Sequence, residues 1–494
     1  MLRLSVPEKE DLMRLKFSVA LFILPFVSLA QIIPIKTVPV ATGDQFMLFP
    51  SNNLGMGGVS IAEEDEMLDP FMNPAKGSRI PGVRLMSAPV YYSISAPSGG
   101  AGGSTSLSVP VGLLFRTESS LFGGVYWARQ SMKAQSSASA GVAPALRSGG
   151  FSESDNPHNS FNFGLLGFRV PETDISFAAS GFWGDLNAVE GVRLLFPNAN
   201  VRQTGIYSQY QLGAVAKLDN EEILEATVVK SALKMRYDVI RNMIGEGDVV
   251  NPVSIESNED ETTLWGIRLG YLRPLAEKWR FGVQITGNWK DHPKIPNYQI
   301  MSIPRDPGNS SAYNFGIGVA KRTISSTFGL DVIFEPIRTE TWADAAQVIR
   351  TARGGSILPG QKTVENSFNF SNWIARMGAR FEKEMSDFQL GVQVHSFSYH
   401  LFQDDHVQVN KTDIDQHWNE WTLSIGFALK YSTIHVRYTG LATFGTGMPI
   451  VDTQWASRVS AESLADFIPA VNRPISVRES IVFTHQISIS AQIF

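Results

Sequence analysis

The feature that most constrains this 494-residue chain is a two-residue alternation of apolar with small or polar side chains. It is clearest in five segments, which cover residues 265–271, 281–289, 313–319, 388–394 and 423–431. Because successive side chains on a β-strand point to opposite faces, each segment would have one apolar surface and one small or polar surface. The alternation therefore predicts an all-β fold built from antiparallel strands.

Weaker alternation fills the intervals and brings the count to about 16 segments. The additional segments are residues 83–94, 105–115, 120–130, 160–169, 174–184, 203–217, 224–239, 324–334, 367–382, 433–444 and 481–494. Antiparallel bacterial barrels have even strand numbers and strands of roughly 10 residues. Since some of the segments are expected to flank or precede the barrel, we prefer 14 strands, with 16 as the next choice.

Composition is compatible with a sheet that has one face in lipid, although an ordinary β-sandwich would share it. Charged residues make up 18% of the chain, against about 25% in ordinary soluble domains. Beyond the N-terminus, no apolar run is long enough to cross a membrane as a helix. A chain that spans the membrane would therefore cross it as strands, and we predict a transmembrane antiparallel β-barrel.

Aromatic residues cluster at the ends of the segments, where amphipathic rings would lie at the depth of the lipid headgroups. They are Tyr126, Trp127, Trp183, Trp265, Trp279, Trp289, Trp373, Tyr399, Trp418 and Trp421. The alternative is that Trp and Tyr suit any half-buried sheet. We expect two aromatic girdles.

Short and long connections between the segments tend to alternate, which is the asymmetry of outer-membrane barrels. The tight connections include residues 171–174, 273–276 and 383–386. The long ones are residues 131–159, 241–261, 291–311, 335–366, 402–417 and 445–480. Short helices are expected near residues 343–350 and 461–468.

The N-terminus reads as a secretory signal peptide over residues 1–30. Arg14 and Lys16 precede an apolar run at residues 17–27, and small residues lead to a cleavage site after Ala30. A membrane anchor is the alternative, although the run is short for a spanning helix. Three acidic residues ahead of Arg14 are unusual in such a segment, so Met13 is an alternative start of translation to Met1.

The chain ends at Phe494, and a terminal aromatic on the last strand resembles the signal that the barrel-assembly machinery reads. Phe494 is, however, out of phase with the apolar face of that segment. Signal peptide, strands and C-terminus together predict the outer membrane of a diderm bacterium.

Several chemistries are excluded or not supported. The chain has no cysteine, which excludes disulfides, cysteine-bound zinc, iron–sulfur clusters and thiol catalysis. A net charge of −5 gives no basic footprint for nucleic acid.

One dense polar cluster contains His400, Asp404, Asp405, His406, Asp413, Asp415 and His417. It suits a divalent cation, but a solvated loop is the preferred interpretation. We predict no metal, no cofactor and no enzyme, because no nucleophile, base and orienting group occur in a recognisable arrangement.

A glycine-rich and acidic stretch precedes the first strand. It contains Leu54-Gly55-Met56-Gly57-Gly58-Val59-Ser60, then four acidic residues, then Asn73-Pro74-Ala75. A plug inside a narrow lumen needs glycine where the backbone turns sharply or passes close to the wall, and an Asn-Pro pair sets a rigid turn. An ordinary loop is the alternative. A dinucleotide site is not expected, because no βαβ unit is visible.

These motifs resemble the N-terminal signature of the long-chain fatty-acid transporter (FadL-type) superfamily, which PorV-type barrels of type IX secretion share. The resemblance covers about 25 residues, and Lys76 stands where the family usually has glycine. It implies a 14-stranded barrel closed by an N-terminal hatch, with residues 31–82 as extension and hatch and 83–494 as barrel. The hatch residues would be Gly55, Met56, Gly57, Gly58, Asn73, Pro74 and Ala75.

The resemblance implies uptake of a hydrophobic molecule, such as a fatty acid, through a plugged lumen. Arg268, His395 and Lys430 fall on the small or polar phase of their strands, so they would face the lumen. The sharper hypothesis is that a cation there meets a fatty carboxylate, and the alternative is the ordinary polarity of a barrel lumen. The alternatives are a PorV-type component or anchor of a secretion system and a structural barrel without ligand. The expected partners are membrane lipid, a hydrophobic small molecule, secretion-system proteins in the second case, and the barrel-assembly machinery.

Overall fold

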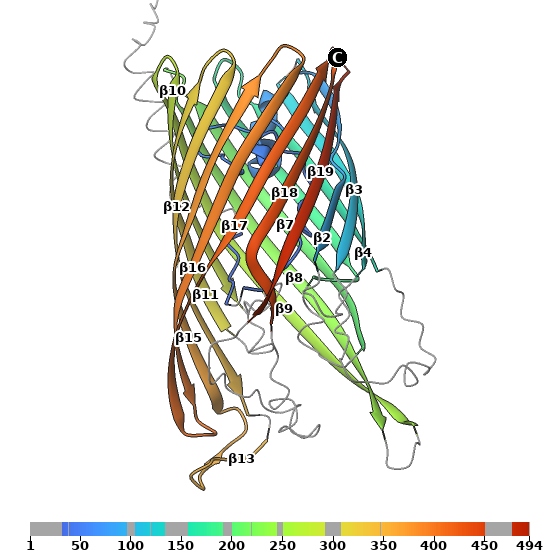
Figure 1. Cartoon of the computed structure of the whole chain (residues 1–494), viewed down its shortest axis with the longest axis vertical. Helices are drawn as coiled ribbons and strands as arrows, with labels where there is room; N and C mark the ends of the chain where they lie inside the picture. Colours follow the sequence, from blue (N-terminus) through green and yellow to red (C-terminus); the bar gives the residue numbers. More distant parts are fainter. Residues whose placement is uncertain are drawn as a thin grey trace, which may run out of the picture.

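One large antiparallel sheet, closed on itself, makes up nearly all of the regular structure (Figure 1). The computed structural model describes residues 32–37, 39–95, 104–118, 120–133, 157–190, 200–218, 220–244, 250–291, 308–345, 347–449 and 477–493. The predicted signal peptide and the terminal Phe494 lie outside these residues. No helix among the described residues is long and apolar enough to cross a membrane.

The closed sheet contains 17 of the described strands, and all of its pairings are antiparallel. These are β1 (Val83–Ser87), β2 (Val90–Ile94), β3 (Thr105–Arg116), β4 (Leu121–Lys133), β5 (His158–Arg169), β6 (Ile175–Leu186), β7 (Asn200–Lys217), β8 (Ile223–Ile244), β9 (Val250–Ala276), β10 (Trp279–Asp291), β11 (Gly308–Arg322), β12 (Ser326–Asp344), β15 (Lys362–Glu382), β16 (Ser386–Asp405), β17 (Asn410–Tyr431), β18 (Ile434–Pro449) and β19 (Val477–Gln492).

Strands β1 and β2 occupy a single position in the barrel, because both pair with β19 on one side and β3 on the other. The barrel therefore has 16 strand positions. The break falls at Ala88 and Pro89, and proline has no N–H to contribute to a ladder. All 16 predicted segments became strands. The preferred count of 14 was too low and its alternative of 16 is correct, since no segment flanks or precedes the barrel.

The apolar phase of each strand faces outward, as the alternation predicts. Ile425 on β17 is 46% exposed, whereas its neighbour Ser424 faces inward and is 6% exposed. The same arrangement holds for Phe315 and Ile317 on β11. A closed antiparallel sheet with an apolar exterior and a polar interior is the architecture of a bacterial outer-membrane barrel. The predicted fold class is confirmed.

Most of the predicted girdle residues lie on the outer surface. Trp421 and Tyr431 bound the apolar face of β17, and Trp279 and Trp289 bound that of β10. A separation of ten residues on a tilted strand spans about 25 Å, the height of the apolar band of such barrels. Three girdle assignments were wrong. Tyr126, Tyr399 and Trp418 are buried and belong to the inward phase of their strands.

The connections are short at one end of the barrel and long at the other. The strands run further at the long-loop end than the sequence predicts, so much of residues 241–261, 335–366 and 402–417 is strand. The helix expected near residues 343–350 is instead part of a small hairpin of β13 (Ile349–Arg350) and β14 (Ser356–Ile357). Residues 461–468 lie outside the described residues.

Residues 32–82 contact inward-facing side chains on many strands. They contain η1 (Leu54–Met56), α2 (Asp69–Met72) and η2 (Pro74–Arg79). These short helices are drawn in blue within the outline of the sheet, nearer the short-turn end, where the C-terminus also lies (Figure 1). The first strand then begins at Val83.

Candidate functional site

The candidate site is built from two parts of the N-terminal region and the barrel wall. We call residues 32–37 and 39–44 the strap, and residues 51–80 the compact segment. The strap contacts β10 and β16–β19. The compact segment contacts β3–β7 through η2, whose Lys76 also reaches Glu225 on β8, and β15–β18 through η1.

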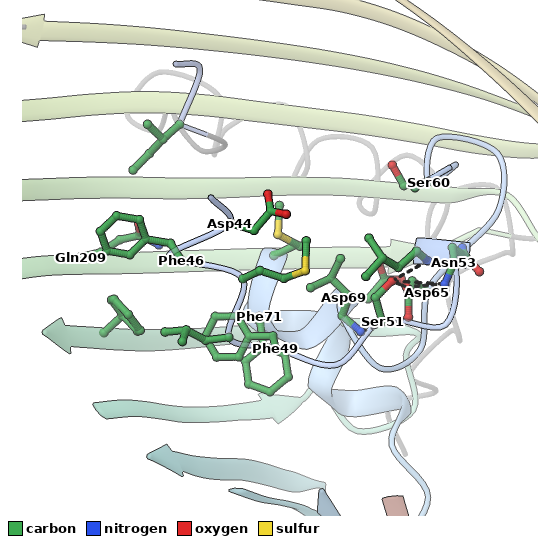
Figure 2. A pocket seen from close by; sticks show the side chains of 18 of the residues that line it. Asp44, Phe46, Phe49, Ser51, Asn53, Ser60, Asp65, Asp69, Phe71 and Gln209 are labelled. Atoms are coloured by element: carbon green, nitrogen blue, oxygen red, sulfur yellow. Dashed lines mark hydrogen bonds between the residues drawn. The ribbon is translucent and has the colours of Figure 1, made fainter. Parts of the chain in front are cut away.

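Asp65 holds the compact segment together. Its carboxylate accepts hydrogen bonds from Ser51 Oγ (2.6 Å) and from the backbone N–H groups of Asn53 (3.1 Å) and Leu68 (3.1 Å). Asp65 is buried, and Figure 2 shows it beside Ser51 and Asn53. One carboxylate thus ties the glycine motif to the start of α2. The sequence analysis noted the acidic stretch but did not single out this residue.

The predicted hatch glycines lie where the backbone turns or passes close to the wall. Gly57 has a left-handed conformation (φ 72°), and a Cβ there would lie 2.8 Å from the carbonyl oxygen of Val392. A Cβ on Gly55 would lie 2.9 Å from the Cα of Gly426. Both distances are shorter than real Cβ contacts allow, so these positions admit only glycine without movement of the wall. Met56, between them, is fully buried.

The wall supplies matching glycines that the sequence analysis did not assign to the site. A Cβ on Gly378 or Gly391 would collide with the backbone of Met56 and Gly57, and a Cβ on Gly282 would collide with the backbone of Ile61. The signal was present in the sequence, because these glycines fall on the inward phase of their strands. The segment and the wall therefore approach each other backbone to backbone.

The predicted Asn73-Pro74-Ala75 turn starts η2. Asn73 Oδ1 accepts a hydrogen bond from Ala75 N (3.1 Å), and its Nδ2 donates to the carbonyl oxygens of Ala214 (3.3 Å) and Ala226 (3.4 Å). Pro74 follows at the first helical position, where its missing N–H costs nothing. Asn73 both caps η2 and attaches it to β7 and β8.

Lys76, which departs from the resembled motif, belongs to a buried ionic network. Its Nζ lies 3.1 Å from Asp69 and 2.9 Å from Glu225 on β8, and Arg268 on β9 lies 3.6 Å from Glu225. Burial raises the pKa of Asp69 to about 6, and the Lys76 charge only partly opposes this effect. The pKa of Lys76 is raised, because Asp69 and Glu225 together outweigh its loss of hydration.

The strap is attached to the wall nearer the long-loop end. Ile33 N donates to Asn288 (2.6 Å), Tyr399 donates to the carbonyl oxygen of Thr37 (2.8 Å), and Ala41 N donates to that of Gly447 (2.6 Å). Tyr399 points inward, where its hydroxyl group donates this hydrogen bond to the strap. This explains one of the wrong girdle assignments.

A cavity of about 630 Å³ is lined from both the strap and the compact segment. Its apolar lining includes an aromatic group of Phe46, Phe49, Phe71, Phe163, Phe182 and Tyr207. Phe49 stacks on Phe71 at 4.0 Å between ring centroids, and Figure 2 shows the two rings side by side. The volume lies within the range of small-molecule sites, which are mostly apolar.

The cations that line the cavity already have protein partners. Arg268 pairs with Glu225 (3.6 Å), Arg376 donates to Gln393 (2.9 Å), and Lys290 donates to the carbonyl oxygen of Ile33 (2.6 Å). The last two were not singled out from the sequence, although both fall on the inward phase.

Of the three predicted lumen cations, only Arg268 lines the cavity. His395 stacks on Phe397 and lies 3.6 Å from Glu335. Lys430 lies at the short-turn end, 3.6 Å from Glu382 and 3.7 Å from Asp387. The structure does not bring these three residues together.

The histidine and aspartate cluster lies at the long-loop end. His400 contacts Asp413 (3.3 Å) and Asp415 (3.0 Å), and all three are exposed. Over the described ranges, no group of three or more His, Asp or Glu side chains is arranged to hold a metal ion.

No protein-family model matches the chain, and no curated protein matches it. Among solved structures, a Pseudomonas aeruginosa FadL homologue is 12% identical and covers 91% of this chain and 99% of its own, with a TM-score of 0.43. The CymD monoaromatic hydrocarbon channel is 11% identical over 91% and 99% (TM-score 0.41). The Ralstonia pickettii toluene transporter TbuX is 9% identical over 90% and 97% (TM-score 0.37).

The close approach at the wall predicts that Gly391→Val destabilises the protein. A side chain at this position collides with Gly57, so the free energy of unfolding should fall by about 1–3 kcal/mol. Gly164→Val is the matched control, because a Cβ there meets nothing within 4 Å, and it should change stability by no more than about 0.5 kcal/mol. Urea titration in detergent measures both. Equal stability of the two variants would contradict the close packing of Gly57 against Gly391.

The raised pKa of Asp69 predicts a specific pH dependence. The folded protein binds this proton near pH 6 and the unfolded chain only near pH 4, so Asp69 makes unfolding harder as the pH falls through that window. The contribution is on the order of 3 kcal/mol, is fully present below about pH 4 and is lost as the pH rises through 6. Asp69→Asn should remove it, whereas Asp174→Asn, in an exposed ion pair with Arg169, should keep it. An unchanged pH profile for Asp69→Asn, measured by unfolding titrations, would refute this assignment.

Proposed function

We propose that this outer-membrane barrel takes up a neutral apolar molecule and holds it in the cavity between the strap and the compact segment. The observation that carries the proposal is the cavity of about 630 Å³ inside the barrel, whose lining includes a group of six aromatic side chains. Polar lumen walls are the rule in such barrels. An aromatic group gathered there from Phe46 and Phe49, which connect the strap to the compact segment, from Phe71 and from strands β5–β7 favours an apolar ligand.

The polar groups at the cavity favour a neutral ligand over a carboxylate. Arg268, Lys290 and Arg376 each have an acceptor within the protein, so a ligand carboxylate would have to displace one of them. Asp44 and Asp69 also line the cavity and would repel an anion. A fatty acid is the second choice, and it would bind at Lys290, which has no carboxylate within 4.0 Å among the described residues.

We also propose that the compact segment is the hatch of this barrel. Its hydrogen bonds to the wall support a stable closure: Asp331 accepts from Ser60 N (2.7 Å), Ser424 donates to the carbonyl oxygen of Gly55 (3.1 Å), and Gln389 donates to that of Asn52 (2.9 Å). The strap would then cover the cavity on the long-loop side, where ligand enters.

A component of a secretion system and a structural barrel are the alternatives. Native mass spectrometry of the detergent-extracted protein separates the three, since it shows a bound small molecule, a bound protein or neither. The uptake proposal predicts that a small apolar ligand either stays bound through purification or binds when it is added.

Filling the cavity should abolish binding. Ser231 on β8 lines the cavity, and Ser231→Phe should weaken the binding of an added aromatic hydrocarbon on the order of tenfold or more, because the ring occupies the ligand volume. Ala232→Phe, one residue along on the lipid-facing side, is the matched control and should bind as the unsubstituted protein does. Tryptophan fluorescence or calorimetric titration with the hydrocarbon and with a long-chain fatty acid measures both. If neither probe binds the unsubstituted protein, the proposal fails.

A further inference from the structure

The turns at the short-turn end differ sharply between the two sides of the barrel. On one side, large apolar side chains stand at or beside the turn tips. Ile324 is fully exposed, Tyr431 is 71% exposed, and Met385 and Leu275 are 59% and 58% exposed. Together with Ile434, these residues form what we call the apolar rim.

The rim is continuous around one side of the barrel. Its residues belong to the connections β9–β10, β11–β12, β15–β16 and β17–β18, and these strand pairs are successive neighbours in the sheet. A scattered apolar residue on a protein surface needs no explanation, whereas a contiguous exposed group does.

The remaining turns at the same end are mainly polar. The β3–β4 turn exposes Thr117 and Glu118, and the β5–β6 turn exposes Glu172 and the ion pair of Arg169 with Asp174. The β7–β8 turn exposes one apolar side chain, Leu218, together with acidic residues. The turn tips of the short-turn end therefore carry large apolar side chains on one side and mainly polar side chains on the other, where Leu121 at the start of β4 is also exposed.

We propose that the apolar rim is immersed in the lipid leaflet at the short-turn end, so that the barrel lies deeper in the membrane on its β9–β18 side. The rim continues the lipid-facing surface without a gap. Outward-facing Phe328, Phe381 and Phe388 lie on the strands within three residues of the turns, and each is 38–45% exposed. Lipid that covers these rings covers the turn tips as well.

Charges beside the rim fit headgroups at this depth. Lys321 lies over the ring of Trp279, with its Nζ 5.3 Å from the ring centroid, and Lys278 and Lys383 are exposed in the turns beside the equally exposed Glu277 and Glu384. Long cationic side chains keep their stems along apolar surface while the ammonium group reaches the phosphates. The leaflet accommodates such one-sided immersion by a tilt of the barrel or by local thickening on that side.

The absence of cysteine from the sequence makes the test direct. Single cysteines at Ile324 and Met385 carry a nitroxide spin label in proteoliposomes at a low protein-to-lipid ratio, which leaves no second copy or soluble partner to cover the rim. Glu118→Cys and Glu172→Cys are matched turn-tip controls on the polar side. Ile425→Cys, in the middle of the lipid-facing surface, is the membrane reference.

The expected result is an inversion of collision accessibility between the two sides. Labels at Ile324 and Met385 should be more accessible to oxygen, which concentrates in the bilayer, than to a water-soluble nickel complex, as at Ile425. Labels at Glu118 and Glu172 should show the opposite order. Equal accessibility to the nickel complex at all four turn tips overturns the proposal. The heat-dependent gel mobility of each variant confirms that its barrel is folded, and ligand binding does not enter the measurement.

Discussion

The structure depends on the requirement that every backbone N–H and C=O group inside a bilayer be hydrogen-bonded within the protein. A sheet meets this requirement only when its first and last strands pair, and here β1 and β2 complete the ladder with β19. Closure fixes the rest of the arrangement. Apolar side chains must face lipid, so the alternate positions face a narrow interior whose polar groups need partners.

The N-terminal region supplies many of those partners. Asp331 and Ser424 on the wall bond to the backbone of the compact segment, and Arg380 bonds to Asn52 and Asn53. A buried polar group without a partner is costly. The irregular backbone in the interior therefore stabilises the barrel by supplying hydrogen-bond partners, and it also obstructs the lumen. The inward glycines allow that backbone to come close enough to bond. The contacts of η2 with the wall are uneven: it packs on apolar side chains of β3–β7, whereas its contact with β8 is ionic, between Lys76 and Glu225. The cavity lies where neither contact fills the space.

Much of the barrel could be predicted from the sequence, because inside the membrane each strand must be apolar on one face. All 16 segments and their outward phases follow from this rule, as at Phe315 and Ile425. Beyond the membrane the rule no longer applies, since both faces of a strand contact water there. The outer parts of β16 and β17 therefore look like loops in the sequence, although they are paired strands.

The contacts inside the lumen were less predictable, because they join residues that are distant in the chain. Tyr399 and Trp418 look like girdle residues, yet one bonds to Thr37 and the other stacks on Phe397. Nothing local distinguishes Asp65 from the acidic residues beside it. The glycine and Asn-Pro motifs were recognisable because they answer a local need for sharp turns. The cavity itself required the positions of both the strap and the wall.

The most direct test of this account is the ion conductance of single proteins in planar bilayers. If residues 51–80 close the lumen, the intact protein should show no steady conductance, and a variant in which a short glycine–serine linker replaces these residues should open a stable pore. An intact protein that conducts as freely as the variant would contradict the account.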